Sequence, residues 1–176
     1  MTDPSVPPIP LWLSHLPTLG GLAIPWNTLR ADDGRYLFGG IDSGRTARAL
    51  RERLCGVCGL PLVHPMVLLM RLSDLPRHGT VEPALHPQCA NYTAAACPMV
   101  AGRLRTYRAT PIRLDYTMAR ADDTPARLGA PADPWFAVWL RNYQVASIGG
   151  HLAASYAGTE PLRIRPITWR YPNVLA

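Results

Sequence analysis

The chain has 176 residues, of which 48% are hydrophobic and 17% charged, and this composition describes a globular protein rather than a disordered tail. Its 19 prolines and 14 glycines exclude a long helical bundle or coiled coil and favour short strands and ordered loops. The net charge is +6, and all 18 basic residues are arginine, which permits binding to nucleic acid without requiring it.

The first third of the chain alternates turn signals with short apolar runs. Residues 1–24 form a proline-rich, apolar N-terminal arm, which we expect to pack on the domain or to bind a protein partner. Tyr36–Phe38 follows an Asp-Gly turn and has the pattern of a strand. A helix then begins near Asp42 or Ser43, either of which can cap it, and continues to the first cysteine pair.

The rest of the chain predicts several strands and one helix. The apolar run Leu62–Leu72 indicates one or two buried strands, with a loop over 73–83. The alanine-rich segment Pro87–Cys97 predicts a helix that begins at a proline and ends at the next one. A further helical turn is expected within 99–107. Residues 135–145 predict a strand, and so do residues 162–169, where an internal proline indicates a sheet edge.

These elements together indicate an α+β fold, a small mixed domain with short strands and Pro/Gly-rich loops. We divide it into the arm (1–24), a zinc-binding domain (25–110) and a strand-rich C-terminal extension (111–176) packed on the same domain. No apolar run approaches the roughly 18 residues of a membrane span. No basic and then apolar leader is found at the N-terminus either, so we expect a cytoplasmic protein without membrane contact.

The cysteines have the spacing of a metal site. Cys55 and Cys58 flank a tight turn followed by glycine, as in a zinc knuckle. His86 and Cys89 are three residues apart at the start of the predicted helix, so both project to one side. The helix N-terminus also favours the thiolate form of Cys89. The sequence therefore predicts a treble-clef-like structural zinc site with four ligands, namely Cys55, Cys58, His86 and Cys89.

Other roles for the cysteines are open at this point. Cys97 competes with His86 for the fourth position, although about 12 Å of straight helix would separate it from Cys89; otherwise it is a small buried residue. Disulfides would need an oxidising compartment. A redox C-x2-C motif usually opens a helix, whereas here a helix precedes it. A catalytic zinc would need a vacant position, which exists only if His86 is not a ligand.

Two stretches carry a family resemblance. Arg51–Leu62 contains the C-x2-C-G knuckle, and a later helix contains His86-Pro87-Gln88-Cys89-Ala90 and then Cys97-Pro98. This double motif resembles a group of uncharacterised small proteins of actinobacteria and their phages. The resemblance implies zinc binding and a cytosolic bacterial or phage setting, and it implies no particular activity.

A second likeness is to HNH nucleases, which also build a treble clef. His64 follows the knuckle near the place of their general base, and Asn91 follows Cys89. However, no aspartate precedes His64 and no glycine pair follows it, so the alternative is a strand-end histidine bonded to backbone. His15, His78 and His151 stand alone in the sequence and are expected to be surface or loop residues.

The arginines suggest the function that we favour from sequence, which is nucleic-acid binding by a non-enzymatic zinc protein. Two groups of three flank the predicted metal site and could contact the phosphates of DNA or RNA; otherwise they are solvated faces. The groups are Arg45, Arg48 and Arg51, and Arg103, Arg105 and Arg108. The alternative is a protein-interaction module with zinc as a staple, based on the apolar arm and the five tryptophans.

Overall fold

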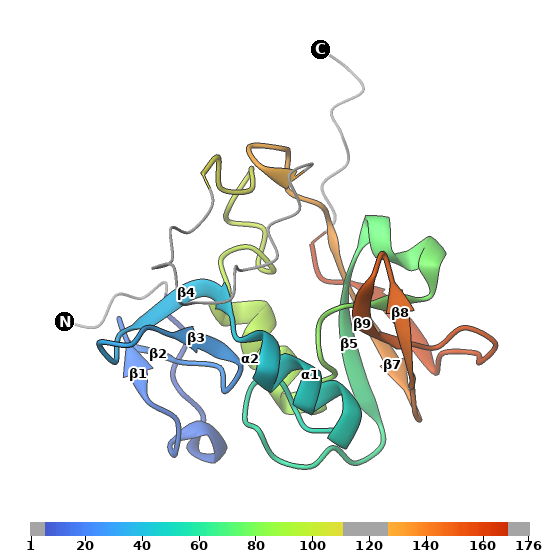
Figure 1. Cartoon of the computed structure of the whole chain (residues 1–176), viewed down its shortest axis with the longest axis horizontal. Helices are drawn as coiled ribbons and strands as arrows, with labels where there is room; N and C mark the ends of the chain where they lie inside the picture. Colours follow the sequence, from blue (N-terminus) through green and yellow to red (C-terminus); the bar gives the residue numbers. More distant parts are fainter. Residues whose placement is uncertain (1–5, 111–126, 169–176) are drawn as a thin grey trace.

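The computed structural model describes residues 6–110 and 127–168, and the fold is α+β (Figure 1). It contains helices α1 (Ser43–Glu52) and α2 (Pro87–Ala96) and the short 3-10 helices η1 (Leu11–Leu13) and η2 (Leu72–Arg77). All strand pairings within the described residues are antiparallel. The strands are β1 (Thr18–Leu19), β2 (Leu22–Ala23), β3 (Thr28–Arg30), β4 (Tyr36–Ile41), β5 (Met66–Arg71), β6 (Gly79–Thr80), β7 (Trp135–Leu140), β8 (Gln144–Ile148), β9 (His151–Ser155) and β10 (Arg163–Pro166).

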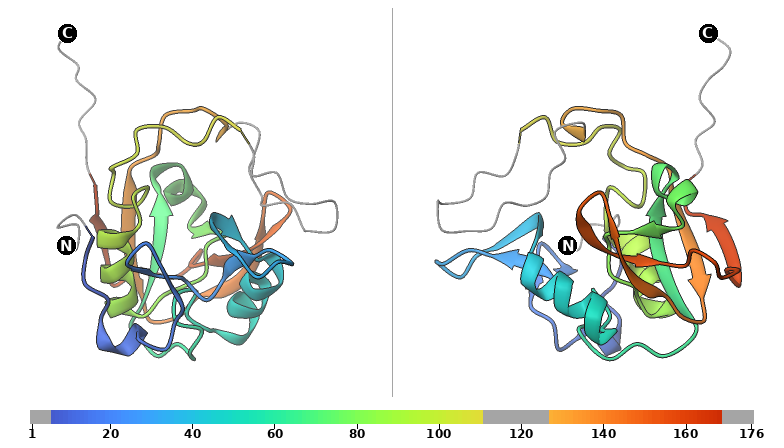
Figure 2. Two further views of the ribbon diagram at one scale, coloured as in Figure 1. Left: turned by 90° about the vertical axis from the view of Figure 1, so that its left-hand side faces the viewer. Right: turned by 45° about the vertical axis from the view of Figure 1, so that its right-hand side comes forward.

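The two helices lie between the N-terminal hairpins β1–β2 and β3–β4 and the remaining strands (Figures 1 and 2). The central sheet has the order β10-β7-β5, and a second sheet has the order β6-β9-β8. None of the described helices is long and apolar enough to cross a membrane.

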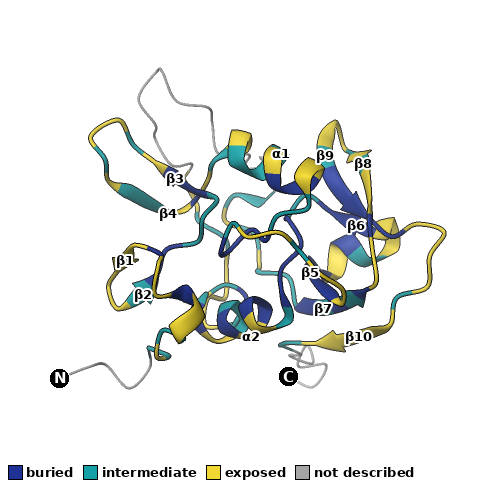
Figure 3. Cartoon of the chain, turned by 90° about the horizontal axis from the view of Figure 1, so that it is seen from below, coloured by how far each residue is buried: buried dark blue, intermediate teal, exposed yellow. Residues whose placement is uncertain are grey.

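Strand β5 is buried on both of its faces. It pairs with β7 along its whole length, from Met66 opposite Leu140 to Arg71 opposite Trp135. Alternate side chains of β5 enter two different apolar clusters, because successive residues of a strand point to opposite sides. Every residue of β5 is therefore buried, which explains the continuous apolar run in the sequence and confirms the predicted buried strand. Figure 3 shows β5 and β7 as buried and β10 as the exposed edge.

The first cluster joins segments that are far apart in the sequence. It contains Leu13 and Leu16 of the N-terminal arm, Val67 and Leu69 of β5, and Trp135 of β7, together with three of the cysteines. The apolar arm thus contributes directly to the core, although its Leu11 remains 85% exposed. We conclude that burial of Leu13 and Leu16 fixes this segment on the domain.

The second cluster lies on the other face of the central sheet. It contains Leu50 of α1, Leu68 and Met70 of β5, Val138 of β7, and Tyr143. The hydroxyl of Tyr143 donates to the carbonyl of Leu50 at 2.8 Å, which satisfies a carbonyl near the end of α1. None of the cysteines belongs to this cluster, so it stabilises the sheet independently of the candidate metal ligands.

Helix α1 begins at Ser43, and the residue before it is the cap. The side chain of Asp42 accepts a hydrogen bond from the backbone N–H of Arg45 at 2.9 Å. The helix ends at Glu52, where Arg53 takes a left-handed conformation (φ 55°) and turns the chain into the cysteine pair. Of the two caps that the sequence allowed, the structure uses Asp42.

Several segments differ from the sequence expectation. Residues 135–145 form two strands rather than one, because the chain turns between β7 and β8. The loop expected over 73–83 contains most of η2 and the two-residue strand β6, and β9 had no predicted counterpart. Residues 98–102 form turns rather than a helical turn. These elements are short or weakly patterned, and pairing between distant segments decides them.

Candidate metal centre

The first two cysteines lie on a tight turn between α1 and β5. The N–H of Gly59 donates to the carbonyl of Cys55 at 2.8 Å, and the N–H of Cys55 donates to the carbonyl of Leu60 at 2.8 Å. Gly59 has a φ of +72°, a left-handed conformation that favours glycine. This knuckle, Cys55–Gly59, therefore places the two sulfurs at the two ends of one turn.

The other two candidate ligands lie at the start of α2. His86 is the residue before the helix, Pro87 is its first residue, and Cys89 lies in its first turn. The segment just before the helix is held on both sides. Leu85 exchanges backbone hydrogen bonds of 2.8 and 2.9 Å with Val67 of β5, and the carbonyl of Ala84 accepts from the knuckle. The helix start is thus anchored beside the knuckle.

The four side chains converge in the interior. One ligand atom from each of Cys55, Cys58, His86 and Cys89 lies within 4.8 Å of the others, and all four residues are buried. The Sγ of Cys58 lies 3.4 Å from the Nδ1 of His86. A tetrahedral site with Zn–S of about 2.3 Å and Zn–N of about 2.0 Å places such a pair roughly 3.5 Å apart. The donor set and its spacing therefore fit a tetrahedral metal ion.

A backbone carbonyl orients the histidine ring. The Nε2 of His86 lies 2.9 Å from the carbonyl oxygen of Pro61, which can only accept, so the proton is on Nε2. In the neutral ring that binds a metal, Nδ1 is then the nitrogen with the lone pair, and it faces the Sγ of Cys58. Such an outer hydrogen bond fixes the tautomer of a metal-binding imidazole. Sequence reasoning missed Pro61, because every residue has a backbone carbonyl and the residue type therefore does not show which one accepts this hydrogen bond.

The charge state of the thiols also favours a cation. Hydrogen bonds from the side chains of Cys58 and Cys89 lower the pKa of Cys55 to about 3. The same contacts raise the pKa of Cys89, since a second thiolate beside the first is unfavourable. Three sulfurs this close can all be thiolates only when a cation balances them, which a divalent metal ion does.

Cys97 lies outside this group. It caps the far end of α2, eight residues after Cys89, and is half-buried. The structure thus brings together the four residues predicted as ligands and leaves the competing cysteine apart. His64 and Asn91, the residues of the nuclease alternative, are both exposed and also lie outside the group.

The first arginine group is only partly available to a ligand. The guanidinium of Arg45 donates to the carbonyl of Trp26 at 2.7 Å and lies over the Trp26 ring. Arg48 forms an ion pair with Glu52, one helical turn further on, at 2.9 Å. Arg51 is exposed, and it forms no ion pair with any residue in the described parts of the chain.

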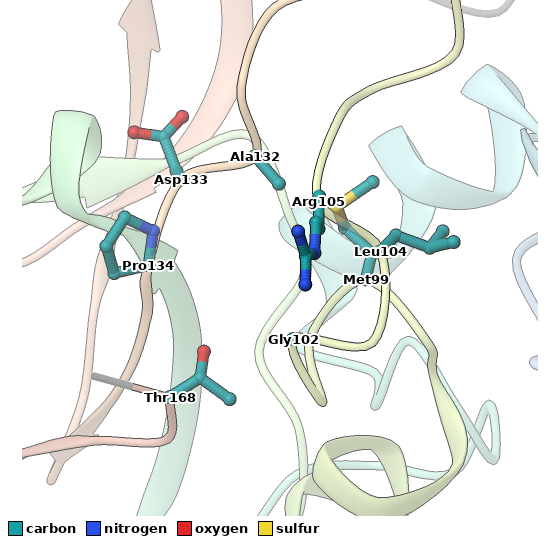
Figure 4. Close-up of a pocket in the computed structure, with 8 residues that line it drawn as sticks. All are labelled: Met99, Gly102, Leu104, Arg105, Ala132, Asp133, Pro134 and Thr168. Carbon is teal, nitrogen blue, oxygen red and sulfur yellow. The ribbon is translucent and has the colours of Figure 1, made fainter. Parts of the chain in front are cut away.

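The second arginine group is divided in the same way. Arg103 donates to the carbonyls of Ala95 and Ala96, both at 2.9 Å, and so caps the C-terminal end of α2. Arg108 donates to a carbonyl of strand β4. Arg105 instead lines an open cavity of about 380 Å³ (Figure 4). The residues around that cavity are Met99, Gly102, Leu104, Arg105, Ala132, Asp133, Pro134 and Thr168.

No protein-family model, curated protein or solved structure matches the chain. The geometry of the Cys3His cluster is therefore the strongest indication of what the protein does.

Proposed function

We propose that the protein binds one Zn²⁺ through Cys55, Cys58, His86 and Cys89, and that the ion is structural. The observation that carries this proposal is the convergence of four buried ligand atoms within 4.8 Å. Four protein ligands complete a tetrahedron and leave no position for water or substrate, which is the pattern of structural zinc. The three sulfurs favour zinc over the hard ions calcium and magnesium.

Titration with Co²⁺ tests the site, because tetrahedral thiolate-bound Co²⁺ absorbs strongly in the visible range and Zn²⁺ displaces it. We expect one Co²⁺ per chain, with displacement by one equivalent of Zn²⁺. His86→Ala should weaken metal binding by at least about tenfold, since it removes a ligand. Cys97→Ala is the control and should bind as the parent protein does. Equal loss in both variants, or no tetrahedral spectrum, would contradict the proposal.

Nucleic-acid binding is the second candidate function, and charge favours it. The chain carries a net charge of +6, and Arg51 and Arg105 offer guanidinium groups that form no ion pair with the described residues. Arginine is well suited to phosphate because its planar fork donates two parallel hydrogen bonds. The other four arginines of the two groups already contact this protein's own carbonyl or carboxylate groups.

Fluorescence anisotropy with labelled duplex DNA and single-stranded RNA at two salt concentrations tests this function. Replacing both Arg51 and Arg105 with alanine should reduce the salt dependence of binding by about one unit per lost phosphate contact. Arg35→Ala is the control, because Arg35 pairs with Asp33 in an exposed turn. Absence of binding at low salt would eliminate the function, and an unchanged slope would eliminate these two residues as contacts.

A further inference from the structure

The N-terminal segment, defined here as residues 6–28, holds the outer side of the knuckle. Three consecutive knuckle carbonyls each lie within hydrogen-bond distance of a donor group of this segment. The N–H of Asn27 donates to Gly56 at 3.3 Å, and the N–H of Trp26 donates to Val57 at 2.8 Å. The Nε2 of His15 lies 3.3 Å from the carbonyl of Cys58. The carbonyls between and beside the two cysteine ligands are thus satisfied by a distant part of the chain.

Side chains of the same segment pack against the knuckle. The Trp26 ring covers Gly59 so closely that a Cβ added there would lie 2.7 Å from Cγ of the ring. Arg45 of α1 also contacts Trp26, because its guanidinium donates to the Trp26 carbonyl and lies over the ring. Leu13 and Leu16 belong to the same buried cluster as three of the candidate ligands. The knuckle and the segment therefore share one packed interface.

The segment also contacts the other half of the metal centre. The N–H of Ala23 donates to the hydroxyl of Tyr92 at 2.9 Å, and Tyr92 lies on α2 one turn after Cys89. The N-terminal segment thus touches both the knuckle and the helix that supplies the remaining ligands. A metal ion bound at the four ligands would join the same two parts from the inside.

We propose that metal binding and docking of the N-terminal segment are coupled, so that loss of the metal releases this segment while the central sheet stays folded. The proposal rests on the proposed zinc site. The metal fixes the knuckle against the start of α2, and only that arrangement presents the carbonyls and Tyr92 to the segment together. Because two events that favour one conformation strengthen each other, docking must also raise metal affinity. Release would expose Leu13 and Leu16, which are only 0% and 7% exposed in the docked state.

Hydrogen exchange monitored by mass spectrometry tests the release, using the full chain with one equivalent of Zn²⁺ and after chelation. We expect amides of residues 13–28 to exchange at least about tenfold faster without the metal, and amides of β5 and β7 to change less than twofold. Unchanged protection of residues 13–28, or equal loss throughout the chain, would overturn the coupling. Metal content measured on the same samples separates the two proposals: no bound zinc defeats the proposed site, whereas bound zinc without release defeats only the coupling.

A variant of the segment tests the reciprocal effect without touching a ligand. Trp26→Ala removes the ring that covers Gly59, and we expect zinc affinity to fall by about tenfold, within the usual range of such coupling. Trp12→Ala is the matched control, because Trp12 lies in the same segment and is 49% exposed. Its zinc affinity should stay within twofold of the parent value. Equal affinities for Trp26→Ala and the parent, or equal losses in both variants, would overturn the proposal.

Discussion

Replacing Cys55 with serine is expected to lower the melting temperature by roughly 10 °C. A ligand present at about a thousand times its dissociation constant stabilises the folded state by about 4 kcal/mol. For a chain of this size each kcal/mol corresponds to about 2–4 °C. Cys55 is fully buried among the other candidate ligands, so its loss removes the metal and that stabilisation together. Thermal unfolding followed by circular dichroism measures the effect.

Cys97→Ser provides the matched control for this experiment. Cys97 is also a free cysteine, but it lies at the far end of α2 and outside the cluster. The melting temperature of the Cys97→Ser variant should fall by no more than a few degrees. A chelator should lower the melting temperature of the parent protein by most of the amount that Cys55→Ser does. It should leave the melting temperature of the Cys55→Ser variant unchanged. A chelator-insensitive parent, or equal losses in the two serine variants, would show that the cysteines act by packing alone.

Arg71→Ala is expected to destabilise the protein by about 3–5 kcal/mol, because it leaves two carboxylates without their buried partner. Arg71 is 7% exposed at the end of β5. Its guanidinium lies 3.2 Å from Asp74 and 3.0 Å from Glu82, and its Cζ lies 4.9 Å from the centre of the Trp135 ring. Burial alone would lower the pKa of Arg71, but the charges of Glu82 and Asp74 outweigh it and raise the pKa.

Urea denaturation of Arg71→Ala measures the loss as a lower transition midpoint. Arg51→Ala is the matched control, since Arg51 is exposed and its removal should change stability by no more than about 0.5 kcal/mol. A loss below about 1 kcal/mol in Arg71→Ala would mean that water solvates the two carboxylates after the change. The larger loss of about 3–5 kcal/mol is expected only if water cannot reach the two carboxylates once Arg71 is removed.

Arg71 also illustrates what sequence reasoning could not find. It follows five apolar residues of β5 and looks like an ordinary charged residue at the end of a strand. Its partners lie in η2 and just after β6, within a stretch expected to be a loop. No repeating pattern in the sequence indicates these ion pairs, because the charges meet only through the path that the folded chain takes.

The two arginine groups also show what sequence reasoning could not find, namely which arginines bind other parts of this protein. Spacing predicted two basic faces, and α1 does carry Arg45, Arg48 and Arg51, whereas Arg103, Arg105 and Arg108 lie in irregular chain after α2. The structure nevertheless uses Arg45, Arg103 and Arg108 to satisfy backbone carbonyls of other segments. Binding of nucleic acid therefore stays a prediction, and it now rests on Arg51 and Arg105 rather than on six residues.

By itself the sequence determined the features that depend on near neighbours. The knuckle has two cysteines three residues apart with a glycine after them, and α2 begins at a proline, which is favoured at a first helical position, so both follow from local geometry. The α+β class, the buried strand β5 and the exposed edge strand β10 were predicted correctly for the same reason. Tertiary structure alone decided which distant groups complete the site. Pro61 orients His86 and the N-terminal segment covers the knuckle, because these contacts depend on where separate segments pack rather than on residue spacing.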